Sequence, residues 1–136
     1  MKKGLLFAML GLTIVLFGVS CKKDDNTNST NSSPQGTWTG TGQYGTAPGS
    51  PTYAFTLTFK ANGTVDITGN NNAGIDNATG TWQIVQDSVK ATYTYAAASA
   101  TYTLSGKYSS TSNLMIGTIG LGTSTTGIGL FSVTRQ

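Results

Sequence analysis

Few side chains of this 136-residue chain are of the types that carry out chemistry. The chain contains no histidine, one cysteine (Cys21) and five acidic residues, of which only Asp66, Asp76 and Asp87 follow residue 25. This composition largely excludes catalytic triads, histidine metal sites and most general-base mechanisms. The Asn-rich stretch 70–77 holds one carboxylate, whereas a calcium loop normally brings several. We therefore expect no catalytic residues, no metal site and no cofactor.

The charged residues do not form a basic patch. The formal net charge is +3, but Lys2 and Lys3 stand at the extreme N-terminus. From residue 21 onward the chain has six basic and five acidic side chains. Because phosphate binding needs clustered Lys or Arg, we expect no nucleic acid partner.

The N-terminus carries the pattern of an export signal. Lys2 and Lys3 precede an apolar run over residues 5–19. The run is shorter than the ~20 residues that a helix needs to cross a bilayer. A charged start and a small-residue end are typical of a secretory signal. Residues 1–20 are therefore predicted to be a signal peptide that is removed from the mature protein.

The end of this run is more specific. Gly18, Val19 and Ser20 lead directly into Cys21, which as the single cysteine cannot form a disulfide within the chain. The motif resembles the lipobox of bacterial lipoproteins, although Gly18 stands where leucine is commoner. The resemblance implies that the Cys21 sulfur carries a diacylglyceryl group and that the new amine is acylated, with palmitate as the expected kind of chain. Two or three such chains anchor a protein firmly. The alternative is an ordinary secreted protein with a free cysteine.

The residues after Cys21 favour a place at the cell surface. Lys23, Asp24 and Asp25 resemble the Lys plus paired-acid signal that moves Bacteroidota lipoproteins to the outer face of the outer membrane. The alternative is that these charges only solvate a tether. The stretch 26–35 is almost entirely Asn, Thr and Ser, and is expected to stay flexible because it has no apolar surface to bury. Residues 21–35 thus form the predicted lipid anchor and tether.

Residues 36–136 show the two-residue alternation of half-buried strands. In 53–59, large apolar side chains take every second position and small residues, mostly threonine, take the others. A second run, 64–68, follows Asn62-Gly63, a dipeptide that favours a tight hairpin turn. Similar runs occupy 37–44, 81–84, 89–95, 102–106, 114–119 and 128–133. About eight short strands predict an all-β, antiparallel up-and-down barrel, with a β-sandwich as the alternative.

Both ends of this domain resemble a known pattern. Gly36-Thr37-Trp38 opens the first predicted strand and Arg135 closes the last one. They resemble the calycin pattern of lipocalins, in which Gly-x-Trp begins the barrel and a basic residue of the final strand lies over the indole. The resemblance implies a lipocalin-like barrel whose first and last strands are fastened by Trp38 and Arg135, a contact worth ~0.5–2 kcal/mol. We interpret this pair as a barrel closure, with a ligand site as the alternative.

The candidate ligand-binding residues are the inward aromatic residues Trp82, Tyr93, Tyr95 and Tyr102, which combine apolar rings with hydroxyl groups. An eight-stranded barrel either fills with its own side chains or holds one small ligand. A domain of ~100 residues needs much of this surface for its own stability, which favours a filled interior.

Two functions remain open at this point. In the one that we prefer, a non-catalytic lipoprotein binds a small apolar or glycan-related ligand, or a protein partner, at the open end of the barrel. In the other, a structural or accessory lipoprotein with a filled barrel acts through its loops as an adhesin, inhibitor or assembly subunit. The first predicts an aromatic-lined cavity of ~300 Å³ or more, and the second predicts a packed interior.

Overall fold

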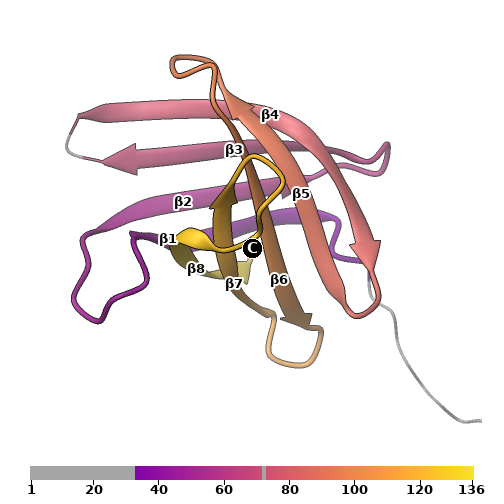
Figure 1. Cartoon of the computed structure of the whole chain (residues 1–136). Helices are drawn as coiled ribbons and strands as arrows, with labels where there is room; N and C mark the ends of the chain where they lie inside the picture. Colours follow the sequence, from indigo (N-terminus) through magenta and orange to yellow (C-terminus); the bar gives the residue numbers. More distant parts are fainter. Residues whose placement is uncertain (1–32, 72) are drawn as a thin grey trace, which may run out of the picture.

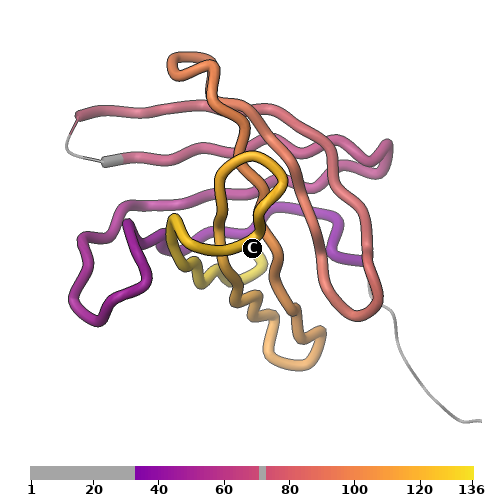
Figure 2. The backbone as a smooth tube through the Cα atoms, in the orientation of Figure 1, coloured from indigo at the N-terminus to yellow at the C-terminus, as the bar shows by residue number. Residues whose placement is uncertain are grey.

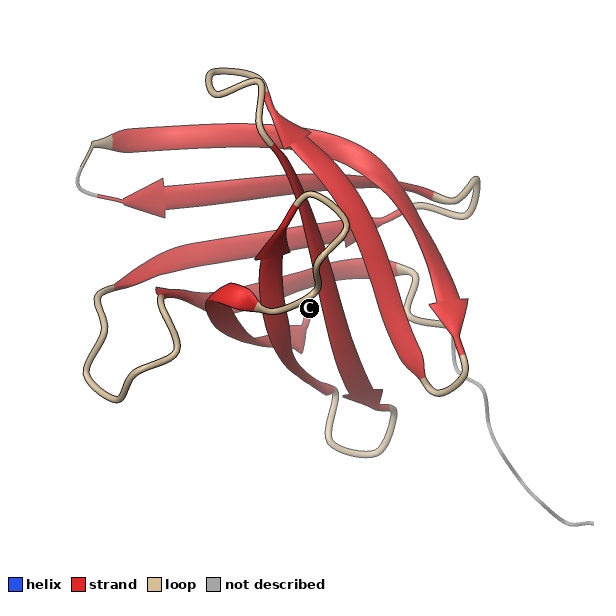
Figure 3. Ribbon diagram, in the orientation of Figure 1, coloured by secondary structure: helices blue, strands red, loops and turns tan. Residues whose placement is uncertain are grey.

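The computed structural model describes residues 33–71 and 73–136, and every regular element in them is a β-strand (Figure 3). This part of the chain therefore holds no helix that could cross a membrane. The predicted signal peptide, Cys21, Lys23, Asp24 and Asp25 lie outside the described residues. The strands are β1 (Gly36–Tyr44), β2 (Thr52–Phe59), β3 (Thr64–Asn71), β4 (Gly74–Val85), β5 (Ser88–Tyr95), β6 (Thr101–Ser109), β7 (Leu114–Leu121) and β8 (Gly127–Arg135).

The strands form a closed barrel in chain order, each antiparallel to the next (Figure 1). β8 returns to pair with β1, from Trp38 opposite Arg135 to Tyr44 opposite Gly129. The prediction of an up-and-down barrel is confirmed, and the alternative of a β-sandwich is wrong because the ring of hydrogen bonds is complete. Successive connections alternate between the two ends of such a barrel, so the loops after β1, β3, β5 and β7 share one end.

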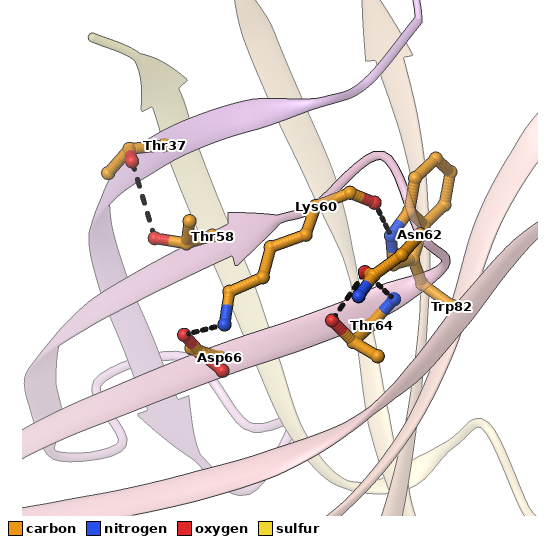
Figure 4. A network of polar contacts seen from close by, with 7 residues as sticks. All are labelled: Thr37, Thr58, Lys60, Asn62, Thr64, Asp66 and Trp82. Atoms are coloured by element: carbon orange, nitrogen blue, oxygen red, sulfur yellow. Dashed lines mark hydrogen bonds and ion pairs between the residues drawn. The ribbon is translucent and has the colours of Figure 1, made fainter.

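The two-residue alternation separates the interior from the outer face. Phe55, Leu57 and Phe59 of β2 are buried, as are Val65 and Ile67 of β3. The threonines between them point outward and pair across strands, as in the contact of 3.3 Å between the Thr37 and Thr58 hydroxyls (Figure 4). The inward aromatic and aliphatic residues therefore form the hydrophobic core.

β3 and β4 are longer than the sequence predicts. The Asn-rich stretch reads as a loop, yet Asn70 pairs with Ile75 and Gly69 pairs with Asp76 in the two strands. The side chains there are mostly polar, so the sequence shows no hydrophobic alternation, but the backbone pairing of β3 with β4 continues to Asn71 and Gly74. As a result, Asp76 lies on a strand rather than in a solvated turn.

β4 bends sharply on its way from one end of the barrel to the other (Figure 2). Gly80 makes this bend possible, because a Cβ atom at this position would lie 2.0 Å from the Thr92 carbonyl oxygen and 2.7 Å from the Tyr93 Cα. A glycine in a strand commonly marks such a close backbone approach at a barrel corner.

Candidate ligand-binding site

One end of the barrel is sealed by the N-terminal segment and the last strand. The guanidinium of Arg135 lies over the Trp38 ring, 5.0 Å from its centroid, which is the arrangement that the calycin resemblance implies. The Trp38 Nε1 atom donates a hydrogen bond of 2.7 Å to the carbonyl of the buried Pro34. Arg135 Nη2 donates to the carbonyl oxygens of Ser33 and of Gln35, the latter at 2.8 Å. Trp38 Nε1 and Arg135 Nη2 are thus bound within the protein, and Arg135 Nε is buried without a hydrogen-bond partner among the described residues. Because Trp38 and Pro34 are fully buried here, this end acts as a plug.

The opposite end, here called the mouth, carries a cluster of tyrosines on β5 and β6. The rings of Tyr93 and Tyr102 are stacked with centroids 5.9 Å apart. Tyr95 stands edge-on to both, at 5.6 Å from Tyr93 and 5.7 Å from Tyr102. The register of β5 and β6 produces this arrangement, because Tyr93 pairs directly with Tyr102. The structure thus brings together three of the four predicted ligand-binding residues.

A second pair of tyrosines, on β1 and β2, faces this cluster across the mouth. Tyr44 and Tyr53 have ring centroids 4.6 Å apart. Gly42 allows the Tyr53 ring to lie flat against β1, since a Cβ atom at this position would lie 2.3 Å from the Tyr53 Cζ atom. In a ring of eight strands, β1 and β2 stand opposite β5 and β6. Two tyrosine walls therefore face each other.

A cavity of about 210 Å³ lies between these walls. Gly69 of β3 and Asp76 of β4 line one of the remaining sides, and Ile119 and Ile128 of β7 and β8 line the other. The complete lining is Gln43, Tyr44, Tyr53, Gly69, Asp76, Tyr93, Tyr95, Ala98, Tyr102, Ile119, Ile128 and Gly129. The interior is packed near the plug and open at the mouth, so neither prediction for the interior is met in full. The aromatic-lined cavity that the binding function predicts is present, but at about 210 Å³ it is smaller than the expected ~300 Å³.

Trp82 does not line this cavity, so the structure separates it from the three tyrosines with which it was grouped. Its ring contacts Phe59 edge-on at 5.5 Å, and its Nε1 atom donates a hydrogen bond of 3.0 Å to the Lys60 carbonyl in the β2–β3 turn (Figure 4). The backbone N–H of Trp82 also donates to the Gly63 carbonyl, at 2.8 Å. Trp82 therefore fixes β4 to the hairpin turn at the other end of the barrel. Ile84, two residues further along β4, is 48% exposed near the end of the strand.

Burial dominates the electrostatics of the tyrosines at the mouth. Desolvation, together with the neighbouring Tyr44 and Tyr102, raises the pKa of Tyr53 to about 12. Burial also raises the pKa of Tyr93 and of Tyr95, and the Asp76 carboxylate adds to the effect on Tyr95. These phenols are therefore neutral hydrogen-bond donors at physiological pH.

The hydroxyls of the cavity are available to a bound molecule. Within residues 33–71 and 73–136, the structure shows no hydrogen bond from the hydroxyls of Tyr53, Tyr93, Tyr95 or Tyr102 to another protein group. They nevertheless face the cavity. A ligand that enters the mouth thus meets ring faces and unused hydroxyls together.

The carboxylates of the described residues form no metal site, since no group of three potential metal ligands comes together there. Asp66 points outward and pairs with Lys60 at 2.6 Å. Asp87 pairs with Lys107 at 2.7 Å, which lowers the pKa of the Asp87 carboxyl. Only Asp76 lines the cavity.

Comparison of the chain with protein-family models, curated proteins and solved structures finds no match. The lipoprotein and lipocalin resemblances of the sequence stay predictions.

Proposed function

We propose that this protein is a non-catalytic binding protein whose barrel holds one small molecule, or one end of a larger one, in the tyrosine-lined mouth. The observation that carries this proposal is the contrast between the two ends of the barrel. At the plug, Trp38 Nε1 and Arg135 Nη2 donate hydrogen bonds to carbonyl groups of the chain itself. The mouth keeps a cavity of about 210 Å³, where the structure shows no hydrogen bond from the hydroxyls of Tyr53, Tyr93, Tyr95 and Tyr102 to another described residue. A cavity of this kind suits a ligand with an apolar body and a few polar groups.

The shortage of catalytic side chains supports a binding role over an enzymatic one. The described residues contain no histidine and no cysteine, and the outward carboxylates of Asp66 and Asp87 are held by lysines. Neutral tyrosines with raised pKa values are poor general bases at physiological pH. Asp76 alone remains as a candidate proton acceptor.

The position of the plug supports an orientation for the proposed lipid anchor. The described chain begins at Ser33, whose carbonyl accepts a hydrogen bond from Arg135 at the plug. A diacylglyceryl group on Cys21 would therefore join the barrel at its sealed end. From there β1 runs to the mouth at Tyr44. The mouth therefore lies at the opposite end of the barrel from the proposed point of attachment, so the anchor does not cover it.

The binding role is tested by blocking the cavity with Gly69→Leu. The nearest atoms to a Cβ atom at Gly69 would be the Tyr95 hydroxyl at 3.5 Å and the Tyr53 ring at 3.6 Å, so the backbone accepts a side chain that projects into the cavity. Full-length wild type and variant are extracted for co-purifying molecules by mass spectrometry, and both are screened by thermal shift against small aromatic, sugar and amine compounds.

We expect at least one compound that co-purifies with the wild type or raises the Tm of the wild type. The same compound should neither co-purify with Gly69→Leu nor raise the Tm of that variant. Circular dichroism checks that the variant is folded. If no compound distinguishes the two proteins, the proposed binding role is refuted.

The proposed surface location is tested separately. Asp24→Ala combined with Asp25→Ala is expected to leave the protein anchored but protected from protease added to intact cells. If the double variant is still cleaved at the surface, these residues are not the export signal.

A further inference from the structure

The only charged side chain among the lining residues of the cavity is a carboxylate. Asp76 lines the cavity, whereas none of the four basic residues of the described chain, Lys60, Lys90, Lys107 and Arg135, does so. The other lining groups are ring faces, hydroxyls, one amide side chain, backbone and aliphatic side chains. The cavity therefore has a negative charge on one side and nothing positive to balance it.

Asp76 differs from the two other carboxylates of the described residues. Asp66 and Asp87 lie within salt-bridge distance of a lysine, at 2.6 and 2.7 Å. No such pair involves Asp76 among residues 33–71 and 73–136. Its backbone pairs with Gly69, and its side chain lies on the inward face of β4 together with the buried Ala78. Of the three aspartates that the structure describes, the one without a lysine partner is thus the one that lines the cavity.

The tyrosine walls complement this charge. Each ring presents a negative face, and a cation positioned within ~6 Å of such a face is attracted by ~0.5–2 kcal/mol, more strongly when water is excluded. Tyr44 and Tyr53 stand on one side of the cavity, and Tyr93, Tyr95 and Tyr102 stand on the other. A cation between them gains from both walls and from Asp76, whereas an anion is repelled by the carboxylate. A neutral molecule gains from packing and from the hydroxyl groups but not from the charge.

The Asp76 carboxylate lies close enough to Tyr95 to add to the effect of burial, which raises the pKa of the Tyr95 hydroxyl. An ammonium group that carries alkyl groups also fits the lining better than an unsubstituted ammonium ion. Its methyl groups can contact the rings and the aliphatic side of the cavity at Ile119 and Ile128.

We propose that the cavity takes a small alkylated ammonium ion, held between the two tyrosine walls with its charge toward Asp76. This inference rests on the proposed binding function and names the chemical class of its ligand. The cavity of about 210 Å³ admits one such headgroup, which is either a free small molecule or the end of a longer one.

The test compares choline with 3,3-dimethylbutan-1-ol, a neutral molecule of the same shape in which carbon replaces the charged nitrogen. Binding of each to the full-length protein is measured by isothermal titration calorimetry. We expect choline to bind at least about tenfold more tightly, and Asp76→Asn to remove most of this preference. Asp66→Asn is the matched control, because it neutralises an outward carboxylate and should leave both affinities unchanged.

A second pair of variants tests the ring faces. Tyr102→Phe keeps the aromatic ring and should retain most of the choline affinity, whereas Tyr102→Leu should weaken it by about tenfold. Thermal denaturation of each variant establishes that it is folded at the temperature of the titration.

The outcomes separate this inference from the function on which it rests. If the neutral isostere, or a methyl glycoside, binds as tightly as choline and Asp76→Asn has no effect on binding, the ligand is not an alkylated ammonium ion. The proposed binding function would still stand. If neither compound binds and Gly69→Leu blocks a different molecule, the inference again fails alone. If nothing binds the wild type in any of these experiments, both proposals fail.

Discussion

Replacing glycine by alanine at two inward positions should change stability in opposite directions. A Cβ atom at Gly69 meets its nearest neighbours, the Tyr95 hydroxyl and the Tyr53 ring, at 3.5 and 3.6 Å, which is ordinary van der Waals contact. At Gly80 it would lie 2.0 Å from the Thr92 carbonyl oxygen, which belongs to the backbone of the paired strand and cannot move aside as a side chain can.

The expected magnitudes follow from these contacts. Gly69→Ala reduces the conformational entropy of the unfolded chain, which stabilises by ~0.4–1 kcal/mol where the native backbone accepts alanine. The new methyl group also covers apolar surface in the cavity, which adds up to about 0.8 kcal/mol. A gain of about 1 kcal/mol raises Tm by ~4–8 °C in a domain of this size. Gly80→Ala must separate β4 from β5, and overpacking of this kind costs ~1–3 kcal/mol or more.

Thermal and urea denaturation, followed by circular dichroism, measure both variants against the wild type. We expect Tm to rise for Gly69→Ala and to fall for Gly80→Ala by at least about 4 °C. If Gly80→Ala is as stable as the wild type, then the close approach of β4 and β5 at Gly80 is not the cause of the bend in β4. A loss of stability in Gly69→Ala would show that the space beside Tyr53 and Tyr95 is already filled.

Three further predictions concern the plug, the buried phenols and the anchor. Arg135→Met should lower the free energy of unfolding by about 1–3 kcal/mol, because it removes the cation over Trp38 and the hydrogen bonds to Ser33 and Gln35. The control Lys107→Met, at an exposed lysine, should lower it by less than about 1 kcal/mol. Equal losses of the two variants in urea denaturation would argue against a barrel closure by Arg135. The raised pKa of Tyr53, about 12, means that the unfolded chain releases its phenol protons first as the pH rises. The contribution of Tyr53 to stability should therefore be constant below pH 10 and fall between pH 10 and 12. The phenolate absorbance that Tyr53→Phe removes should appear together with unfolding, and its appearance in the folded barrel near pH 10 would contradict the burial. Cys21→Ala should move the protein from the membrane fraction to the soluble fraction and abolish palmitate labelling, and an unchanged membrane fraction would rule out the lipid anchor.

The alternation of side chains made much of the fold predictable. Phe55, Leu57 and Phe59 occupy every second position of their strand, and only one face of a strand can turn toward a core. The turn at Gly63 was predictable for a similarly local reason, since its φ of 79° favours glycine. Closure of the barrel was predicted because short loops place successive strands side by side, and an open sheet would leave two unpaired edges.

The cavity could be predicted only in part. Tyr93, Tyr95 and Tyr102 were expected to face inward together, but Tyr44 and Tyr53 of the opposite wall were not assigned to the site. Asp76 was also missed, because its Asn-rich surroundings have no hydrophobic alternation and read as a loop. The signal that could have found it is its spacing: Asp76, Ala78, Gly80 and Trp82 share one face of a single strand.

Trp82 shows what the sequence by itself determined and what only the tertiary structure decided. Alternation along a strand follows from local backbone geometry, so the sequence determined which side chains face the interior. The height of each side chain along the barrel axis depends on the pairing register accumulated around eight strands, and on the bend at Gly80. Trp82 and Tyr95 both point inward, yet one packs beside the β2–β3 turn and the other lines the mouth, because register is set by contacts between distant strands.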